Sequence, residues 1–509
     1  MSKSVKTILV GVLLVFLAFG FLGSRGIWQP DEGYYVATAV TMQEQNNWLV
    51  PKMGESIFLE KPPMMYWGIM AGFQFLGRTE FAARAFHGIC YLATGVIVIF
   101  LGRRIFPGTE VGLWGGVMFM TMPIPFIAAS YITPDMPLTL MTTLAMLAFW
   151  QSLQPQTRHA DLWKVAMCAM LGLGFLCKGP AALIPTAGMF VYLMIHGRVR
   201  QYFFTRSAWI CAATFLVTGL WWYGLISIRV PGAARYFFDN QIWGRLVSDK
   251  YERNPGLGGA LIYFPTILLG CLPWSIGWFS RRKVWMNIKS PLDIWRWLDT
   301  DPAGSFLFCW IVVPLLVLSL ASSKLPLYSL PLFPALAIGS AALWIRDNSV
   351  DGILRPDHLR RTVITIVIWS GIMLLIRLCL AFYPTPNDMR NLWAEIKPHL
   401  PSGLYEILTL DEPADGLVFY GAHEVENITL RPNPYPFFTM PETLPYELGE
   451  IQDDQHPYQI IAHNPKILSL IRNLLHQREI RFREVPLRFE RTLLLCDRFQ
   501  PSESEIPSE

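Results

Sequence analysis

The 509-residue chain has few charged residues, and its cysteines follow no metal-binding pattern. Only 16% of the residues are charged, whereas about a quarter are charged in an ordinary soluble protein. Because 52% of the residues are hydrophobic and 14% are aromatic, the composition indicates a membrane protein. Seven of the eight cysteines lie inside apolar runs and only Cys496 lies near the C-terminus, so neither a zinc site nor a disulfide framework is expected.

The net charge of +4 hides a strong asymmetry along the chain. Residues 384–509 contain 11 Lys and Arg against 20 Asp and Glu, a net charge of −9, whereas the remainder carries 31 against 18, a net charge of +13. Pro384 and Pro386 mark the change in composition. We therefore predict a basic membrane domain over residues 1–383 and an acidic soluble domain over residues 384–509.

The soluble tail has the composition of a small α/β domain. The runs GLVFYG, YQIIAH and RTLLLCDRF have the length of strands. The segment PKILSLIRNLLHQR places apolar residues on one face of a helix, and these are Ile467, Leu468, Ile471, Leu474 and Leu475.

The membrane domain contains about eleven apolar segments long enough to cross a bilayer, which takes about 20 residues. The first follows Lys3 and Lys6, is longer than the apolar part of a signal peptide and has no A-x-A cleavage site after it, so we expect an uncleaved anchor. The predicted spans are 6–26, 84–102, 110–130, 135–152, 162–177, 179–196, 206–228, 258–279, 303–321, 325–345 and 362–383.

Lys and Arg are concentrated in alternate loops, which predicts the orientation of the chain. The basic loops GRRIFPG, QPQTRHADLWK, HGRVRQYFFTR, SRRKVWMNIK and IRDNSVDGILRPDHLRR fall on the side of Lys3 and Lys6, which is therefore cytoplasmic. The long segments 27–83 and 228–257 and the tail fall on the outer side. The segment 27–83 contains helical spacing, and we expect it to lie in the membrane interface with Trp48, Tyr66 and Trp67 at headgroup level.

Charged side chains at membrane depth are costly, so they usually face a cavity or a partner. Those of this chain gather on the outer side: Asp31, Glu32, Glu60, Lys61, Arg84, Asp135, Lys178, Arg245 and Lys324. Each also has a structural interpretation. Asp135, between Pro134 and Pro137, could cap a helix. Glu60 and Lys61, before a double proline, could form a surface turn.

Two lysines occupy similar breaks between apolar segments, in LCKGPAAL at Lys178 and in SSKLPLYSLPLF at Lys324. A single lysine in such a place could extend to the lipid headgroups. Two on the same side favour an anion site, and an ammonium group binds phosphate as a point charge. Acids beside fixed cations predict transfer of a group from a lipid phosphate, in which a carboxylate orients the acceptor or takes its proton.

The ordered motifs DEGYY, EKPPMMYW, EFAARAF, TPDMPLTL, GFLCKGPAALIP, YFFDNQIWGRL and SKLPLYSLPLFP carry a family resemblance over residues 25–340. In this order they resemble the lipid-linked-sugar glycosyltransferases of the GT-C fold. The branch they resemble most is the bacterial aminoarabinose transferase that modifies lipid A, which is related to the protein O-mannosyltransferases. The resemblance implies 11–13 transmembrane helices, a polyprenyl-phosphate sugar donor, inverting transfer and a periplasmic active site.

The resemblance also implies roles for individual residues. Asp31 and Glu32 correspond to the family's first Asp-Glu motif, and Asp135 to the acid of its second loop. We predict these three acids as the catalytic residues. Glu60 corresponds to the Glu-Lys-Pro segment and is the candidate ligand for a divalent metal ion. The predicted donor-phosphate-binding residues are Lys61, Arg84, Lys178, Lys324 and Tyr328.

Two departures concern the identity of the substrates. The aminoarabinose branch typically continues its first motif as Asp-Glu-Thr-Arg-Tyr, whereas Gly33 and Tyr34 stand here in place of Thr-Arg. That branch also tends to carry Glu-His where this chain has Gln241 and Ile242, so a histidine that could help to hold a metal is missing.

We therefore predict an inner-membrane transferase that moves a sugar, such as 4-amino-4-deoxy-L-arabinose, from undecaprenyl phosphate to lipid A or another envelope acceptor. Membrane lipids are expected partners, and nucleic acid is not. Protein O-mannosyl transfer differs only in the acceptor. A flippase or transporter would carry charges at mid-membrane and often internal repeats, neither of which is apparent. A scaffold whose tail binds envelope partners is the third alternative.

Overall fold

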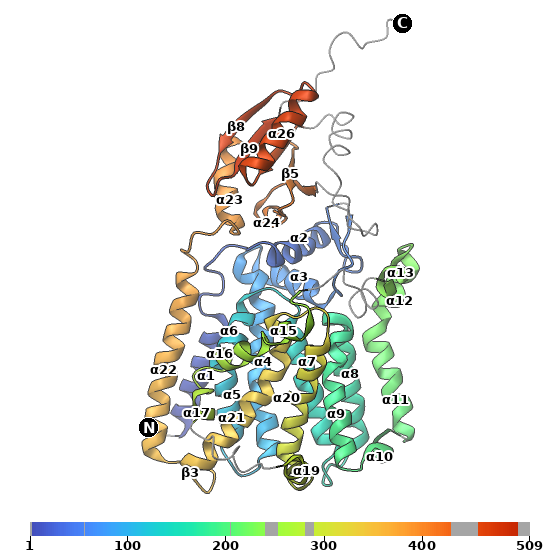
Figure 1. Ribbon diagram of the computed structural model, residues 1–509, viewed down its shortest axis with the longest axis vertical. Helices are drawn as coiled ribbons and strands as arrows, with labels where there is room; N and C mark the ends of the chain where they lie inside the picture. The colour runs from blue at the N-terminus through green and yellow to red at the C-terminus, as the bar shows by residue number, and fades with distance from the viewer. Residues whose placement is uncertain are drawn as a thin grey trace, which may run out of the picture. The chain divides into compact units, whose positions relative to one another are not determined.

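The computed structural model describes residues 3–54, 56–203, 205–239, 253–279, 290–428 and 457–496, which form two compact units (Figure 1). The first contains Met1–Leu22, Glu60–Gly68 and Arg84–Leu378, and the second contains Gly23–Leu59, Ile69–Ala83 and Cys379–Glu509. The second unit therefore holds most of the predicted outer loop 27–83 as well as the tail. This division differs from the single boundary predicted at residue 384, because segments distant in sequence pack together.

The first unit is almost entirely helical. Helix α3 (Met64–Leu76) begins in it, and α4 (Glu80–Ile105) continues into it from the second unit. Its other elements are α1 (Lys3–Phe19), α5 (Val111–Thr121), α6 (Pro123–Ser130), α7 (Asp135–Ser152), α8 (Ala160–Lys178), η1 (Gly179–Leu183), α9 (Ile184–Ile195), α10 (Val199–Phe203), α11 (Arg206–Phe215), η2 (Leu216–Leu220), α12 (Trp221–Arg229), α13 (Ala233–Tyr236), α15 (Gly256–Ala260), α16 (Tyr263–Gly270), α17 (Ile276–Phe279), α19 (Pro291–Thr300), α20 (Pro302–Leu320), η5 (Pro326–Leu332), α21 (Phe333–Asn348), the hairpin β3 (Ser349–Val350) and β4 (Ile353–Leu354), and α22 (Pro356–Cys379).

Within the described residues, six helices are long and apolar enough to cross a membrane, or seven if α5 and α6, which meet at a 58° bend, count as one span. The eleven predicted ranges nevertheless all coincide with helical segments. The difference between the eleven predicted spans and the six or seven observed ones has structural causes. Helix α1 has 17 residues, α7 begins with a buried aspartate, and the predicted span 258–279 is interrupted between α16 and α17.

The continuous apolar stretch Ala160–Ile195 contains two of the predicted spans. A straight helix of that length would measure about 54 Å, well beyond a bilayer core of about 30 Å. The chain breaks at Gly179, whose φ is 59°. Near the start of α8, the ammonium of Lys164 lies 5.1 Å from the ring of Tyr202, and that ring also contacts Phe149, which in turn contacts Tyr192 near the end of α9. Helices α8 and α9 therefore turn back on each other, as the sequence predicted.

Three of the loops predicted to be cytoplasmic, those after α4, α7 and α9, meet at one end of the first unit, whereas the predicted loop SRRKVWMNIK lies outside the described residues. The Trp150 indole donates a hydrogen bond to the carbonyl of Arg104 at 3.3 Å, and the Arg198 guanidinium donates one to the carbonyl of Leu153 at 3.3 Å. The end of α7 thus lies beside the end of α4 and beside the turn after α9. The start of α4, at the other end, carries Arg84. The loop after α4 therefore lies at the opposite end of this helix from Arg84.

The core of the first unit contains a cation that the sequence did not single out. Arg377 of α22 is 4% exposed and donates hydrogen bonds to the carbonyls of Leu17 and Gly20 (3.0 and 3.1 Å) and of Phe126 (3.0 Å). Its guanidinium also lies 3.7 Å from the centre of the Phe126 ring. Because a buried charge must be paired or hydrogen-bonded, these contacts fix α22 against α1 and α6.

The second unit contains a five-stranded mixed sheet in the order β6–β5–β7–β9–β8. Its strands are β5 (Glu406–Leu410), β6 (Glu424–Ile428), β7 (Tyr458–Ala462), β8 (Phe482–Pro486) and β9 (Thr492–Cys496). Strand β5 pairs in parallel with β6 and β7, and β9 pairs antiparallel with β7 and β8. Its helices are α2 (Asp31–Glu44), α23 (Met389–Ile396), η6 (Lys397–His399), α24 (Leu417–Tyr420) and α26 (Pro465–Gln477), and a hairpin joins β1 (Lys52–Met53) to β2 (Ser56–Ile57).

The predicted α/β character of the tail is confirmed, with one correction. YQIIAH and RTLLLCDRF contain strands β7 and β9, and α26 packs Ile471 and Leu475 into the core as predicted. GLVFYG, predicted as a strand, forms the short helix α24 instead. Gly421 ends this helix with a φ of 109°, a conformation that favours glycine. A six-residue apolar run does not carry enough periodicity to separate the two structures.

Candidate active site

Three predicted residues of the first unit meet at one point. The ammonium of Lys178 forms an ion pair with the Asp135 carboxylate, with Nζ 2.5 Å from Oδ1. It also lies 4.1 Å from the centre of the Tyr328 ring, a distance typical of a cation–π contact. Asp135 is 4% exposed. Residues from three separate segments thus form a cluster of a buried acid, a partly buried cation and a partly buried aromatic ring.

Local helix geometry explains why these side chains stand where they do. Asp135 is the first residue of α7 and Lys178 is the last residue of α8. An acid at a helix N-terminus and a cation at a C-terminus both complement the helix dipole. The chain turns sharply after Lys178 because Gly179 adopts a φ of 59°, and a Cβ added there would lie 3.3 Å from the Tyr223 hydroxyl. Only glycine can adopt this φ and also leave room for the Tyr223 hydroxyl without strain.

The ion pair of Lys178 and Asp135 is largely removed from water. Removing two charges from water is costly, and a buried pair recovers that cost only when its geometry is good. One of the three N–H bonds of the Lys178 ammonium is directed at Asp135, and the tyrosine ring shields a further side without accepting a strong hydrogen bond. A phosphate oxygen that approached Lys178 would therefore add a second negative partner to a cation already held in place.

Lys324, the second lysine at a helix break, is also buried, at 1% exposure. Its ammonium donates a 2.6 Å hydrogen bond to the carbonyl of Ala321, just beyond the end of α20. Its backbone is tied to the segment before α15, because its N–H donates to the carbonyl of Arg253 and its carbonyl accepts from the Asn254 amide. Lys324 therefore caps the end of α20 and anchors the segment before α15. It lies four residues before Tyr328.

Arg84 is buried near the start of α4, where its guanidinium donates to the carbonyl of Leu22 at 3.3 Å. One turn further along the helix, His87 is also buried, and its Nε2 lies 2.9 Å from the carbonyl of Thr133. Thr133 is two residues before Asp135, so His87 contacts the segment that carries the acid. The sequence analysis missed His87, although its place three residues after Arg84 on one helix face was a usable signal.

Glu60 and Lys61 lie in the turn before α3, with the two side chains 3.8 Å apart. The Glu60 side chain is 46% exposed and that of Lys61 is 13% exposed. In the described parts of the chain, no three His, Cys, Asp or Glu side chains are grouped so as to hold a metal ion. The possible metal ligation by Glu60 stays a prediction, and no chemical step is assigned to a metal.

Asp31 and Glu32 both belong to the second unit, at the start of α2, but their environments differ. Glu32 is completely buried, and both of its oxygens bind the Arg25 guanidinium, at 2.6 and 2.9 Å. It also accepts a hydrogen bond from the N–H of Trp28 at 3.1 Å. Asp31 is partly exposed. Successive residues on a helix point about 100° apart, so the two adjacent acids face different surroundings.

The structure therefore brings three of the predicted residues together. Asp135, Lys178 and Tyr328 are in contact within the first unit. The predicted meeting of Asp31 with Asp135 joins residues of different units and stays a prediction. Arg245, Gln241 and Ile242 lie outside the described residues.

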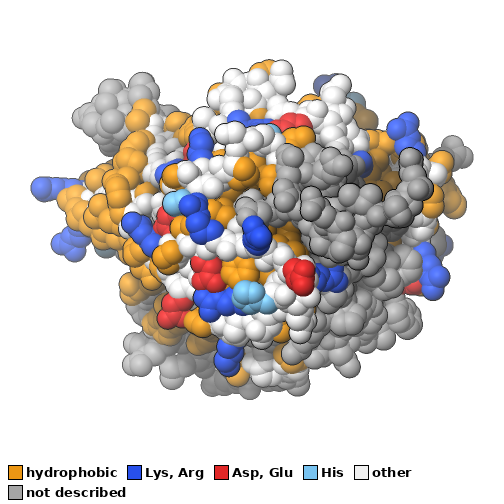
Figure 2. Space-filling view, turned by 90° about the horizontal axis from the view of Figure 1, so that it is seen from above, with side chains coloured by type: hydrophobic (Ala, Val, Ile, Leu, Met, Phe, Trp, Pro, Cys, Tyr) orange, Lys and Arg blue, Asp and Glu red, His pale blue; other side chains and the backbone are white. Residues whose placement is uncertain are grey.

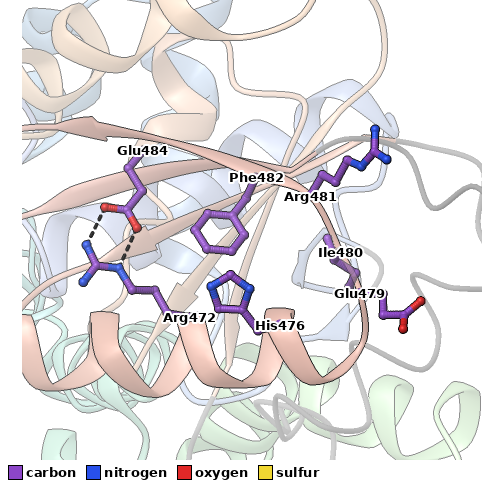
Figure 3. Close-up of a pocket in the computed structure, with 7 residues that line it drawn as sticks. All are labelled: Arg472, His476, Glu479, Ile480, Arg481, Phe482 and Glu484. Carbon is purple, nitrogen blue, oxygen red and sulfur yellow. Dashed lines mark hydrogen bonds and ion pairs between the residues drawn. The ribbon is translucent and has the colours of Figure 1, made fainter.

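A separate hollow lies in the second unit between α26 and β8 (Figure 3). Its volume is about 680 Å³, and its lining residues are Arg472, His476, Glu479, Ile480, Arg481, Phe482 and Glu484. Arg472 and Glu484 form a two-fold ion pair with both distances at 2.5 Å, and these hydrogen bonds lower the pKa of the Glu484 carboxyl. Acidic and basic side chains are also interspersed on the described surface seen from above (Figure 2). Two of the four charged side chains that line the hollow, Arg472 and Glu484, thus neutralise each other.

Comparison with known proteins shows what the chain is similar to. A family model described as dolichyl-phosphate-mannose-protein mannosyltransferase matches residues 60–223. The undecaprenyl phosphate-alpha-4-amino-4-deoxy-L-arabinose arabinosyl transferase of Erwinia tasmaniensis is 31% identical over 323 residues, which are 62% of this chain and 55% of that protein. The protein of the same name from Photorhabdus laumondii is 27% identical over 65% of this chain and 58% of its own length. The chain thus spans less than two thirds of the length of these curated relatives.

The crystal structure of ArnT from Cupriavidus metallidurans bound to undecaprenyl phosphate matches the fold. The TM-score is 0.76, and the match covers 97% of this chain and 98% of that chain, at 20% sequence identity. The unliganded structure of the same protein matches with a TM-score of 0.75. The predicted resemblance and the GT-C fold are both confirmed, and the chain is a multi-pass membrane protein.

Proposed function

We propose that this chain, which resembles the arabinosyl transferases and shares the fold of ArnT, is an inverting glycosyltransferase that uses a polyprenyl-phosphate sugar as donor. The sugar is an aminopentose such as 4-amino-4-deoxy-L-arabinose, and the acceptor is lipid A or another envelope molecule. The observation that carries the proposal is the contact of the buried Asp135 with Lys178, which also lies against the ring of Tyr328, on the fold of a solved structure that holds undecaprenyl phosphate.

In this proposal the cations of the first unit hold the donor phosphate. Lys178 is the central one, because Asp135 and Tyr328 fix its ammonium between them. Lys61 and Arg84 come from neighbouring stretches of the same unit and add positive charge. Lys324 orders the segment that presents Tyr328, since its ammonium holds a helix end. A phosphate that is negatively charged as the glycosidic bond breaks is stabilised by such fixed cations.

Asp31 is the proposed group at the acceptor, and Glu32 supports it structurally. The acceptor oxygen attacks the anomeric carbon, the bond from that carbon to the phosphate oxygen breaks, and polyprenyl phosphate leaves with the bonding electron pair. If the acceptor is a lipid A phosphate, its oxygen is already ionised and Asp31 only orients it. If the acceptor is a hydroxyl group, Asp31 takes its proton as the general base.

The mannosyltransferase family model supports a second candidate, transfer to a protein hydroxyl. The donor site would be unchanged in that case. Only the acceptor would differ, and Asp31 would then be a true base. Mass spectrometry of lipid A and of envelope glycoproteins from a deletion strain distinguishes the two, because the missing sugar identifies the acceptor.

The proposed location is the bacterial inner membrane, with the N-terminus in the cytoplasm and the tail in the periplasm. The clustering of basic loops such as those of Arg104 and Arg198 at one end of the first unit supports this orientation. The predicted site residues Arg84, Asp135 and Lys178 lie at helix ends away from those loops.

The test is the Asp31→Asn variant in membranes supplied with a labelled polyprenyl-phosphate sugar. Transfer should fall roughly 100-fold or more if Asp31 acts on a hydroxyl acceptor, with donor binding retained. Glu44→Gln, at the other end of the same helix, is the matched control and should transfer normally. Full transfer by Asp31→Asn at normal expression would remove this role. Substrate counterflow without any covalent transfer would favour a transporter.

A further inference from the structure

We propose that the C-terminal tail is a positioning element for Asp31, and that it acts through the side chain of Gln29. This inference rests on the role proposed above for Asp31. It gives the tail a part in the reaction, beyond that of a soluble appendage. The contacts that carry it all lie within the second unit.

The central contact joins Gln29 to the loop between β5 and α24. Gln29 is 6% exposed. With its amide oxygen facing that loop, it accepts hydrogen bonds from the N–H groups of Asp415 and Gly416, at 2.6 and 3.0 Å, and its nitrogen donates to the carbonyl of Pro30 at 2.8 Å. The reverse orientation makes one contact of 3.4 Å to the Asp415 carboxylate, so we assign the first. The side chain two residues before Asp31 is thus fixed by the tail.

Backbone contacts hold the same segment in register. The N–H of Gln29 donates to the carbonyl of Asn387 at 2.9 Å, and the N–H of Met389 donates to the carbonyl of Ile27 at 3.0 Å. The N–H of Ile27 donates to the Tyr420 hydroxyl, at 2.9 Å. Residues 27–29 are therefore paired with the start of the tail on one side and with the end of α24 on the other.

Upstream of this pairing, a charged contact holds the chain as it leaves the membrane domain. The Arg390 guanidinium donates to the carbonyl of Ser24 at 3.1 Å and forms an ion pair with Glu80 at 2.7 Å. The whole segment from 24 to 30 is consequently lined by residues 387–390, 415–416 and 420. Its end point, the first turn of α2, cannot shift without breaking these contacts.

Gly33 is the residue that makes room for the central contact. A Cβ at this position would lie 1.7 Å from the nearest terminal atom of the Gln29 amide, which is inside the van der Waals limit, and Gly416 approaches Gly33 as well. Any larger side chain at position 33 would push Gln29 off the loop. The glycine is therefore matched to Gln29 and to the tail loop of this chain.

The consequence is mechanical. A general base or orienting carboxylate must be held within a few tenths of an ångström of its productive position, and a misplacement of about 1 Å can cost about 100-fold in rate. Asp31 is on the first turn of a helix whose approach segment is held by the tail and by the contacts of Arg25 and Trp28 with Glu32. Loosening Gln29 should therefore reduce turnover without reducing donor binding, because the donor cations belong to the first unit.

The experiment is a double-mutant cycle on the full-length protein with Gln29→Ala, Gly33→Ala and the double variant. Each variant is measured for kcat, for KM of the labelled polyprenyl-phosphate sugar, and for amide hydrogen exchange. Gln29→Ala should lower kcat roughly 10- to 100-fold with an unchanged donor KM, and should speed exchange in the first turn of α2 but not in α26. The double variant should be no worse than either single variant, since both act on one contact. Gln45→Ala, at the other end of α2, is the matched control and should change neither kcat nor the exchange in the first turn of α2.

The outcomes separate this inference from the proposed function. Faster exchange in the first turn of α2 together with a lower kcat supports the inference. Unchanged exchange in Gln29→Ala overturns it, as does faster exchange with an unchanged kcat, and strictly additive losses overturn the shared contact. If the wild-type protein transfers no sugar but Gln29→Ala still speeds exchange in α2, the link between tail and helix stands and the proposed function fails. Should Gly33→Ala fail to fold, Gln29→Ala alone decides the outcome.

Discussion

The buried pair of Arg25 and Glu32 allows a decisive test of whether Glu32 is structural or catalytic. Glu32→Gln keeps the size and shape of the side chain and removes its charge. The Arg25 guanidinium, whose side chain is 8% exposed, would then remain buried without its counter-charge. It would also lose the two short hydrogen bonds, of 2.6 and 2.9 Å, in their charge-assisted form.

The magnitude follows from the burial of both partners. Removing one member of a buried ion pair typically costs about 3–5 kcal/mol of unfolding free energy, because the other charge is left unpaired. In a domain of roughly 150–250 residues each kcal/mol shifts the melting temperature by about 2–4 °C. Glu32→Gln should therefore lower the melting temperature of the second unit by roughly 6–20 °C. Since Glu32 also accepts from the N–H of Trp28, the segment leading to α2 should loosen as well.

Thermal unfolding of the purified full-length protein, followed by hydrogen exchange of peptides from the second unit, measures this effect. The matched control is Glu44→Gln, which removes a pair with Arg78 in which the Glu44 side chain is 57% exposed. It should change stability by less than about 1 kcal/mol, as exposed pairs do. If Glu32→Gln were fully stable and yet inactive, the structural assignment would be wrong and Glu32 would be a catalytic residue, as the motif first predicted.

Three further predictions concern the donor site and the tail. Lys178→Gln should lower transfer roughly 100-fold and weaken donor binding, measured with labelled polyprenyl-phosphate sugar, because it removes a fixed cation and leaves Asp135 buried without its partner. Gly179→Ala should cost about 1–2 kcal/mol of stability and lower transfer, because alanine is strained at a φ of 59° and its Cβ would crowd the Tyr223 hydroxyl. Burial raises the pKa of Asp415 from 3.8 to about 6, so its ionisation disfavours the folded state. Asp415→Asn should therefore stabilise the second unit by up to about 3 kcal/mol at pH 7, the gain shrinking as the pH falls from 6 to 4 and vanishing below it in pH-dependent unfolding.

Each of these has a control or a contrary result. Lys164→Gln alters a similar lysine that pairs with Asp161 and lies beside a tyrosine ring at the opposite end of the first unit, and it should leave transfer intact. Normal donor binding by Lys178→Gln would exclude that lysine from the phosphate site. A stable and fully active Gly179→Ala would show that the turn does not hold Lys178 in place. A stability gain from Asp415→Asn that was the same at pH 4 and pH 7 would contradict a buried, titrating carboxyl.

The helical segments could be predicted because a spanning helix needs a long apolar run, a signal that does not depend on partners. The turn at Gly179 could likewise be predicted, since a charged residue followed by Gly-Pro separates two such runs. The short helix of Leu417–Tyr420 could not be distinguished from a strand, because four residues show no periodicity. Arg377 could not be singled out inside an apolar segment, since only its position beside the three carbonyls that accept its hydrogen bonds explains it.

The sequence by itself determined that this is a multi-pass membrane protein with an acidic α/β tail, and which side-chain types carry the chemistry. These properties depend on composition and local order, which the chain carries without reference to its fold. Tertiary structure alone decided that Asp135, Lys178 and Tyr328 meet, because their contact spans nearly 200 residues of chain. It also separated the neighbours Asp31 and Glu32, since helix geometry turned one toward Arg25 and left the other partly exposed. Adjacency in sequence therefore did not determine proximity at the site.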